Sequence, residues 1–309
     1  MKQSLRIGTR GSKLALWQAN HISNLLSISH PELEIEIQVI KTTGDAVLDS
    51  PLSEIGGKGV FVKEIEEALL SENIDIAVHS MKDVPTILPE GLVISAVAKR
   101  HDPRDAFISK TGLTLAELPE GSRVGTGSLR RGSQILHHFP SLNIVSIRGN
   151  VDTRIGKLKE SGEFDAIVLA VAGLERMGLG GEITEIISPE IMLPAPGQGI
   201  VAIESRVNDQ ETTDLLRKIN HIETEIAAIS ERAFLYRLGG DCNVPVGCHA
   251  SLNDNFVNLS GIISSPDGKV LIKNDTSGPI EEARQLGEKL ADMMLQEGGN
   301  KILEELSPS

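Results

Sequence analysis

One segment combines glycine, hydroxyl and arginine residues in a pattern suited to binding an anion. It reads Val124-Gly125-Thr126-Gly127-Ser128-Leu129-Arg130-Arg131. We expect a short strand to end there and a helix to begin near Ser128. Backbone N–H groups at a helix start attract anions, and guanidinium groups bind carboxylate or phosphate through paired hydrogen bonds. Because neighbouring helix residues point about 100° apart, Arg130 and Arg131 are expected to hold different groups.

The same arrangement recurs further along the chain. Arg148 ends an expected strand, and Arg154 lies inside the helix that follows it. The middle third holds Arg100, Arg104, Arg123, Arg130, Arg131, Arg148, Arg154 and Arg176. In open α/β sheets the ligand crevice lies beyond the carboxyl ends of the strands. Any single arginine could be a solvated surface residue, but the repetition favours a site for a ligand with several negative charges.

A carboxylate lies among these cations, in His79-Ser80-Met81-Lys82-Asp83-Val84-Pro85. The segment follows an expected strand at residues 74–78, which places Asp83 near an edge of the sheet. Asp83 and Lys82 could form a surface ion pair, which contributes little. Alternatively, an ionised Asp83 could stabilise a developing cation or move protons.

Cys242 occupies a polar, glycine-rich loop, the setting of a reachable thiol. Cys248 is expected to be a buried apolar residue. A metal site made of Cys242, Cys248 and His249 lacks a fourth ligand, so no metal is expected. The N-terminal third adds Arg10-Gly11-Ser12 after its first strand and Lys58 in a glycine-rich turn, and each of these could also be a plain surface residue.

Composition limits the classes of protein that the sequence can encode. The chain has 309 residues, 30 Lys plus Arg, 43 Asp plus Glu and a formal net charge of -13. With 40% hydrophobic and 24% charged residues it is expected to fold, in more than one domain. The acidic charge and 3% aromatic residues argue against binding nucleic acid. Two cysteines exclude a disulfide framework. With neither a signal peptide nor a membrane-length apolar run apparent, a cytoplasmic location is expected.

Alternating strand and helix patterns predict the elements that position these residues. The strands expected first lie at 5–9, 33–39, 74–78 and 92–98, with helices at about 14–26 and 60–70. A second α/β region is expected from residue 99, and a turn-rich break at 193–199 precedes a strand at 201–203 that could return to the first sheet. From about residue 222 the pattern predicts an α+β unit. It consists of a helix, three short strands at 248–252, 257–263 and 269–272, and a last helix at 280–295.

Together these motifs, in this order and over nearly the whole chain, resemble those of the porphobilinogen deaminase (hydroxymethylbilane synthase) family. The matching segments are 10–19, 56–61, 79–85, 125–131, 148–154, 193–199 and the Cys242 loop. The resemblance implies two α/β domains similar to type II periplasmic binding proteins and a smaller α+β domain. These are expected at residues 1–98 with 193–218, at 99–192 and at 219–309.

The resemblance also implies an activity. Family members are transferases that join four porphobilinogen molecules head to tail, release four ammonia molecules and yield hydroxymethylbilane for tetrapyrrole and haem synthesis. A dipyrromethane cofactor, attached by a thioether at the position of Cys242, primes the chain. Asp83 would be the catalytic carboxylate, because it could stabilise the cationic azafulvene left by ammonia and manage the proton lost after coupling.

Each pyrrole carries an acetate and a propionate, which explains a set of arginines better than a single phosphate would. By family motif the residues that bind cofactor or substrate are Arg10, Ser12, Lys82, Thr126, Ser128, Arg130, Arg131, Arg148, Arg154 and Arg176. Lys58 and Phe61 would belong to a loop over the site. The sequence departs from the family in having Asp241, where glycine is usual before the cysteine, which leaves the geometry of that loop in question.

Two other functions remain open from the residues alone. A solute-binding protein would share the fold of the first two domains but would need no reactive cysteine. A phosphosugar or nucleotide enzyme would use Gly125 to Ser128 as one phosphate site. The partner expected here is the small molecule porphobilinogen, with no nucleic acid or membrane, and the chain is expected to be a monomer.

Overall fold

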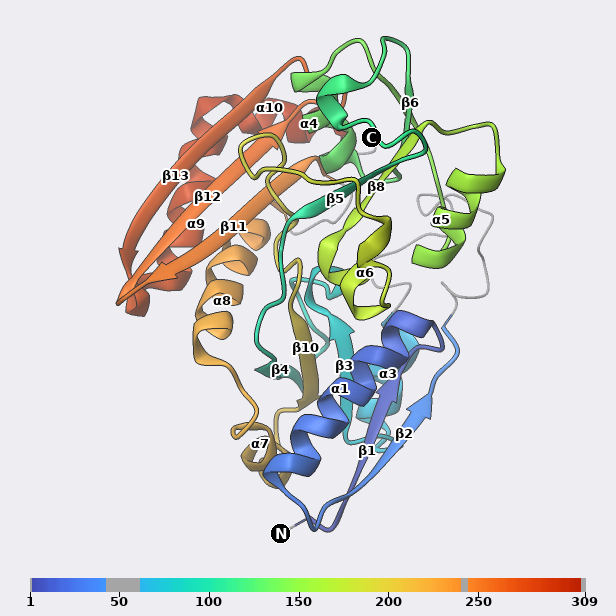
Figure 1. The fold of residues 1–309 in the computed structure, drawn as a ribbon. Coiled ribbons are helices and arrows are strands. Elements are labelled where there is room, and N and C mark those ends of the chain that lie inside the picture. Colours follow the sequence, from blue (N-terminus) through green and yellow to red (C-terminus); the bar gives the residue numbers. More distant parts are fainter. Residues whose placement is uncertain (1, 43–61, 240–243, 307–309) are drawn as a thin grey trace. The chain divides into compact units, whose positions relative to one another are not determined.

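The computed structural model describes residues 2–42, 62–239 and 244–306. Lys58, Phe61 and Cys242, three of the predicted site residues, lie outside these ranges. The chain divides into two compact units, the first of residues 1–101 and 200–225, and the second of residues 102–199 and 226–309. Figure 1 shows the elements of both units along the chain.

The first unit is built on a five-stranded sheet with the order β2-β1-β3-β10-β4. Its strands are β1 (Ser4–Thr9), β2 (Glu34–Val39), β3 (Ile76–Ser80), β4 (Leu92–Val97) and β10 (Val201–Arg206). β1 pairs in parallel with β2 and β3, whereas β10 runs antiparallel to both β3 and β4. The expected return of residues 201–203 to the first sheet is therefore confirmed.

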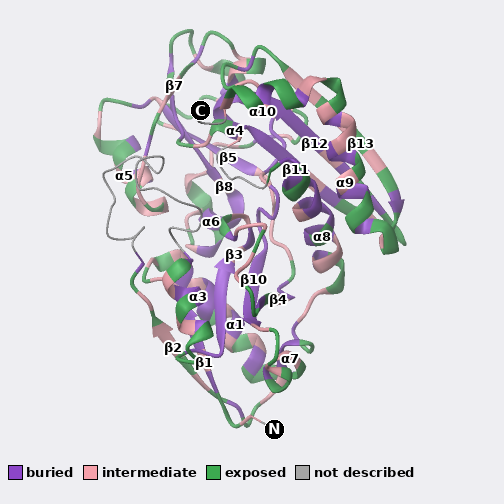
Figure 2. Cartoon of the chain, turned by 180° about the vertical axis from the view of Figure 1, so that it is seen from behind, coloured by how far each residue is buried: buried purple, intermediate pink, exposed green. Residues whose placement is uncertain are grey.

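Helices cover both faces of this sheet. They are α1 (Lys13–Ser29), α3 (Lys63–Leu70) and α7 (Gln210–Leu216). Because successive strand residues point to opposite faces, Ile76 and Val78 of β3 join the core under α1, whereas Ala77 joins the core under α3. Figure 2 shows β3 and β10 as largely buried strands. With both faces covered, β3 reads as a continuous apolar run rather than an alternating one.

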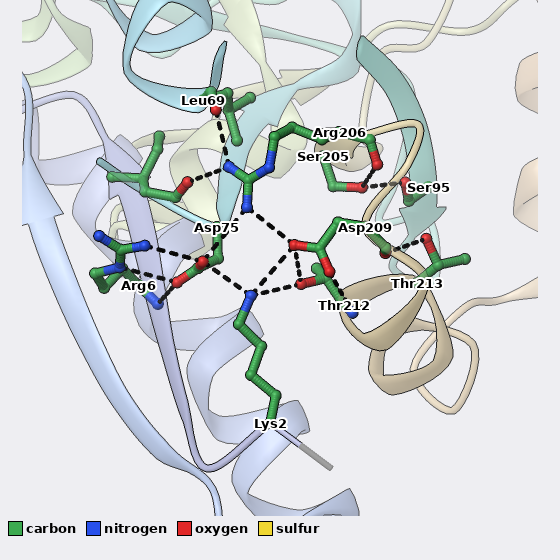
Figure 3. A network of polar contacts seen from close by, with 11 residues as sticks. Lys2, Arg6, Leu69, Asp75, Ser95, Ser205, Arg206, Asp209, Thr212 and Thr213 are labelled. Atoms are coloured by element: carbon green, nitrogen blue, oxygen red, sulfur yellow. Dashed lines mark hydrogen bonds and ion pairs between the residues drawn. The ribbon is translucent and has the colours of Figure 1, made fainter. Parts of the chain in front are cut away.

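An ion-pair network at Asp75, just before β3, ties the sheet to neighbouring segments (Figure 3). The carboxylate accepts hydrogen bonds from Lys2 Nζ at 2.8 Å, from Arg6 Nε at 3.0 Å and from Arg206 Nη2 at 3.5 Å. Burial alone would raise the pKa of Asp75. The hydrogen bonds from Arg6 and Lys2 outweigh that effect and lower the pKa to about 2, so Asp75 is an anion at neutral pH.

The second unit contains another five-stranded α/β sheet, with the order β7-β6-β8-β5-β9. Its strands are β5 (Asp105–Ser109), β6 (Arg123–Gly125), β7 (Asn143–Val145), β8 (Ala166–Ala170) and β9 (Glu185–Ile186). β6 runs parallel to β7 and β8, and β5 runs antiparallel to β8. The helices that follow β6, β7 and β8 are α4 (Leu129–His138), α5 (Val151–Glu160) and α6 (Val171–Arg176).

The same unit includes a three-stranded antiparallel sheet of β11 (Val246–Asn253), β12 (Phe256–Ser264) and β13 (Leu271–Pro279). Helix α9 (Ala283–Met294) packs on this sheet, and α8 (Ile222–Arg237) and α10 (Asn300–Leu306) complete this region. Gly287 of α9 lies so close to α8 that an added Cβ would be 2.2 Å from the Ser230 carbonyl oxygen. The predicted fold class, two α/β sheets and a smaller α+β region, is confirmed. The domain boundaries stay a prediction.

β13 and the last helix differ from the sequence prediction in their extent. β13 continues to Pro279, whereas the pattern predicts a strand only at 269–272. Most side chains of this strand are polar and at least partly exposed, as befits its place at the edge of the sheet, so the strand lacks an apolar alternation. The last helix begins at Ala283 rather than 280, and after a break at Gly298 the chain continues as α10.

Candidate functional site

In the first unit, two parallel neighbouring strands end at one edge of the sheet and lead into predicted site residues. Arg10 follows β1, and Lys82 and Asp83 follow β3 on a single 3-10 turn, Met81–Asp83. Because the carboxyl ends of parallel strands meet at the same edge, this is where an α/β sheet places a ligand site. The structure thus brings Arg10, Lys82 and Asp83 to one edge of this sheet.

Ser12 lies close to these residues in the sequence, and its side chain caps a helix. It is the N-cap of α1, and its Oγ accepts a hydrogen bond from the Ala15 N–H at 3.3 Å. An N-cap of this kind satisfies one of the unpaired donors at the helix start and contributes about 1 kcal/mol. A binding role for Ser12 stays a prediction.

The turn that carries Asp83 is held at both of its ends. Gln18 Nε2 donates to Ser80 Oγ at 2.8 Å, and the Met81 N–H donates to the Ile200 carbonyl at 3.0 Å. The Asp83 side chain itself is exposed, and within the described part of the chain its carboxylate forms no ion pair with Lys82 or with any other residue. Asp83 is therefore an accessible carboxylate on a fixed turn.

In the second unit, three adjacent parallel strands each lead into predicted binding residues. Thr126 and Ser128 follow β6, and Arg148 follows β7. α6, which follows β8, ends with Arg176. This is the repeated arrangement that the sequence predicts at successive strand ends, and it gathers these residues around one edge of the sheet.

Local hydrogen bonds shape two of these strand ends. Ser128 is the N-cap of α4 and accepts from the Arg131 N–H at 3.5 Å, while its own N–H donates to Thr126 Oγ1 at 3.2 Å. Arg154, in α5, donates from Nε to the Gly149 carbonyl at 2.7 Å. The hydroxyl groups of Thr126 and Ser128 thus help to form the turn itself.

Arg130 and Arg131 share one partner within the protein. Both guanidinium groups reach Asp105, a fully buried carboxylate at the start of β5. Arg130 Nη1 donates to Asp105 Oδ2 at 2.7 Å, and Arg131 Nη2 donates to Asp105 Oδ1 at 2.7 Å. Each also donates to a carbonyl oxygen of its own, Arg130 to Leu193 at 2.8 Å and Arg131 to Val168 at 3.2 Å. Which ligand groups the two arginines hold stays a prediction.

The buried cluster of Arg130, Arg131 and Asp105 contains two cations and one anion. Burial alone would raise the pKa of Asp105, but Arg130 and Arg131 hold it far below its usual range, so Asp105 is an anion. Burial lowers the pKa of Arg130 from its usual value. Burial also lowers the pKa of Arg176 to about 10, which leaves Arg176 charged at neutral pH, with Nη2 donating to the Gly199 carbonyl at 2.7 Å.

Sequence reasoning missed the residues that organise these arginines. Asp105 and Gln198 were not among the predicted site residues, yet Gln198 Nε2 donates to Asp105 Oδ1 at 3.0 Å. The available signal was an aspartate at the first position of a strand that is otherwise apolar, where a buried carboxylate needs cationic partners. The pattern of basic residues alone does not reveal Asp105.

Cys248 and the side chains that could bind a metal can be placed within the described residues. Cys248 is fully buried in β11, as expected for an apolar cysteine. Among the described residues, no three His, Cys, Asp or Glu side chains gather into a potential metal site. No helix in the described ranges is long and apolar enough to span a membrane.

The donor set of the second unit fits a ligand with several carboxylates. Its predicted binding groups are guanidinium groups, two hydroxyl groups and the N-terminus of α4. Among the described residues, Asp105 is the only carboxylate that forms an ion pair with Arg130 or Arg131. Guanidinium groups bind carboxylates in a bidentate manner, and an unbalanced positive charge at a buried place favours an anion. A dipyrromethane that carries acetate and propionate groups meets these requirements.

Comparisons with known proteins identify the family of the chain. Residues 5–214 match the family described as "Porphobilinogen deaminase, dipyromethane cofactor binding domain", and residues 226–296 match "Porphobilinogen deaminase, C-terminal domain". The porphobilinogen deaminase of Pelobacter propionicus is 48% identical over 304 residues, covering 98% of this chain and 97% of the relative. That of Syntrophobacter fumaroxidans is 49% identical over 302 residues, with 98% and 97% covered.

Solved structures that resemble the chain include the methionine-binding protein MetQ. It has a TM-score of 0.43 and 14% identity, over 72% of this chain and 92% of that protein. The BenM effector-binding domain with benzoate has a TM-score of 0.42 and 17% identity, over 70% and 90%. On its sequence matches, the chain belongs to the porphobilinogen deaminase family of transferases and contains that family's dipyrromethane cofactor-binding domain.

Proposed function

We propose that this enzyme joins four porphobilinogen molecules head to tail into hydroxymethylbilane, releasing four ammonia molecules, with Asp83 and Cys242 as its essential residues. The reaction is that of its family. The observation that supports the assignment of residues is the set of arginines that follow three adjacent parallel strands of the second unit. A growing chain of pyrroles adds carboxylates at every step, and one basic residue could not bind them all.

Within the second unit, the basic residues bind acetate and propionate groups. Arg148 and Arg154 come from the β7 end, Arg130 and Arg131 from the β6 end, and Arg176 from the β8 end. Thr126 and Ser128 shape the turn between β6 and α4 and can offer hydroxyl groups. When bound, the dipyrromethane supplies the pyrrole carbon to which the first substrate molecule is joined.

Within the first unit, Asp83 acts on the charge that develops during the reaction. Loss of ammonia leaves a cationic carbon on the substrate, and an accessible carboxylate on a fixed turn can stabilise that charge. The same carboxylate can accept a hydrogen bond from the pyrrole N–H and hold the proton that is lost after coupling. Arg10 and Lys82, at the same sheet edge, bind substrate carboxylates.

Cys242 is the proposed attachment residue for the cofactor, and Lys58 and Phe61 are proposed to belong to a loop over the site. All three lie outside the described residues, so these roles rest on the family motifs alone. Asp241 precedes the cysteine where the family usually has glycine. An Asp241→Gly variant that binds cofactor as the wild type does would show that the departure is neutral.

Incubation with porphobilinogen tests the proposed function. We expect release of ammonia and, after acid and oxidation, the absorbance of uroporphyrin. A solute-binding protein would bind a ligand without releasing ammonia, and a phosphosugar enzyme would leave porphobilinogen unchanged. Absence of both products from a chain that carries the cofactor would contradict the proposal.

A cytoplasmic location and a monomeric state also stay proposals. Light scattering on the purified protein measures its mass in solution, and we expect the mass of one chain, 33.2 kDa. Fractionation of the source cells measures the location, and we expect the enzyme in the cytoplasmic fraction.

A further inference from the structure

The two α/β sheets of the chain are built on the same plan. Their strand orders are β2-β1-β3-β10-β4 and β7-β6-β8-β5-β9. In each sheet the second strand in the order runs parallel to both of its neighbours. The fourth strand runs antiparallel to both of its neighbours. Strand by strand, β2 therefore corresponds to β7, β1 to β6 and β3 to β8.

The turn that follows the second strand also corresponds between the two sheets. It leads in three residues from the last residue of the strand to a serine that caps the next helix, from Thr9 to Ser12 and from Gly125 to Ser128. The last residue of β1 pairs with the last residue of β2, and the last residue of β6 pairs with the last residue of β7. The ends of β2 and β7 therefore lie at corresponding places beside these turns.

Basic residues with proposed binding roles follow all of these parallel strands except β2. They are Arg10 after β1, Lys82 after β3, Arg130 and Arg131 after β6, Arg148 after β7, and Arg176 after β8. Lys41 comes two residues after the end of β2, and Arg148 comes three residues after the end of β7. Lys41 is thus the basic residue of the first unit that corresponds to Arg148, and the family motifs did not point to it.

The surroundings of Lys41 leave its charge available to a ligand. The Ile40 N–H donates to the Thr9 carbonyl at 2.8 Å, so the pairing of β2 with β1 continues one residue beyond β2. Val39 Cγ1 lies 3.3 Å from the place that a Cβ on Gly11 would occupy. Lys41 therefore follows directly beside the turn that contains Arg10. It is exposed, and in the part of the chain that the structure describes its side chain forms no ion pair and no hydrogen bond.

We propose that Lys41 is a further binding residue of the first unit and that it holds a carboxylate of porphobilinogen. The identity of the ligand rests on the proposed function, whereas the place of Lys41 rests on the topology of the sheet. The carboxyl ends of β2, β1 and β3 share one edge, where Asp83 also lies. The lysine ammonium group is a compact charge on a flexible stem, which suits a single carboxylate such as an acetate or a propionate.

Steady-state kinetics of the cofactor-loaded enzyme provide the first test. Because Lys41→Gln removes a charged hydrogen bond to the substrate but touches no reacting atom, we expect KM for porphobilinogen to rise about tenfold with kcat nearly unchanged. Lys41→Arg keeps the charge and should restore KM to within about twofold of the wild type. Lys218→Gln is the matched control, because Lys218 is also an exposed lysine of this unit but follows helix α7 rather than a parallel strand. It should change neither constant.

Calorimetry gives a second readout that does not depend on turnover. On cofactor-loaded chains that carry Asp83→Asn, adding Lys41→Gln should weaken the dissociation constant for porphobilinogen about tenfold, with the melting temperature unchanged. An unchanged KM and dissociation constant in the Lys41→Gln chains would overturn the proposal, as would an equal loss in Lys41→Arg. If the wild type released no ammonia from porphobilinogen, the proposed function would fail, while a dissociation constant that depends on the charge at Lys41 would still support the binding role.

Discussion

Glu66 is expected to make the stability of the first unit depend on pH near neutrality. It lies on α3 and is buried above the sheet, with one carboxylate oxygen that has no partner among the described residues. His79 and Glu204 lie on the same face of the sheet, because Ala77 pairs with Glu204 and His79 follows two residues later. His79 Nε2 and Glu204 Oε2 are 3.0 Å apart, and the other Glu204 oxygen is also without a partner in the described chain.

The sign of the effect follows from the direction of the pKa shift. Burial and the negative charge of Glu204 raise the pKa of Glu66 from 4.5 to about 7, and His79 opposes them. The folded state therefore holds this proton more tightly than the unfolded chain does. The resulting stability is present below about pH 4.5 and is lost as pH rises towards and through about 7. At about 1.4 kcal/mol per pKa unit, less some screening by water, the loss is about 1.5–3 kcal/mol.

Glu66→Gln removes this titration while keeping the shape of the side chain. Between pH 5 and pH 8 we expect the unfolding free energy of the wild type to fall by about 1.5–3 kcal/mol relative to that of the variant. Trp17, the single tryptophan of the chain, lies in the same unit on α1, so its fluorescence during urea denaturation reports on the relevant unfolding. Comparing the two proteins at each pH cancels the groups that both share.

Glu67→Gln is the matched control, because Glu67 is the next residue on α3 and is exposed. It removes the same charge from the same helix but should leave the pH dependence of the wild type unchanged. If Glu66→Gln and the wild type differed by the same free energy at pH 5 and at pH 8, the reasoning about Glu66 would be refuted.

Three further predictions follow from other sites. Asp83→Asn keeps the shape of the turn but removes its charge, so turnover of porphobilinogen should fall at least a hundredfold with an unchanged circular dichroism spectrum; near-normal turnover would contradict the proposed role. Asp75→Asn should reduce the free energy of unfolding at pH 7 by about 1–2 kcal/mol, because the pKa of Asp75 is lowered in the folded state. The wild type should lose this stability as pH falls from about 4 to about 2, whereas the variant should not. Denaturation at pH 7 and at about pH 2.5 measures both effects. Gly287→Ala should reduce the free energy of unfolding by about 1–3 kcal/mol or more, because the added Cβ would meet the Ser230 carbonyl oxygen of α8. A melting temperature equal to that of the wild type would contradict this prediction.

Most of the α/β fold could be predicted because its strands and helices have clear apolar patterns. β3 and β8 are short apolar runs between turns, and α4 and α5 begin after strand ends that carry glycine or hydroxyl residues. Even the return of β10 to the first sheet was readable from the turn-rich segment before it. The polar edge strand β13 was not, because its position in the sheet rather than its side chains makes it a strand.

The candidate site was predictable only as a list of chemical groups. The positions of Asp83 and of the arginines follow from strand ends, which a sequence pattern locates well. Their partners do not, because Asp105 and Gln198 are far from Arg130 in sequence and meet it only in the folded chain. For the same reason, the meeting of Arg130 and Arg131 at one buried carboxylate has no counterpart in the sequence.

Intact-protein mass spectrometry after addition of limiting porphobilinogen tests the central claim most directly. The purified wild type should exceed the mass of its chain by one dipyrrole unit. With substrate, the mass should then rise in equal steps, each one porphobilinogen less one ammonia, and the Cys242→Ser variant should show no such steps. A wild-type chain that stays at its bare mass while it releases ammonia from porphobilinogen at full rate would contradict the account.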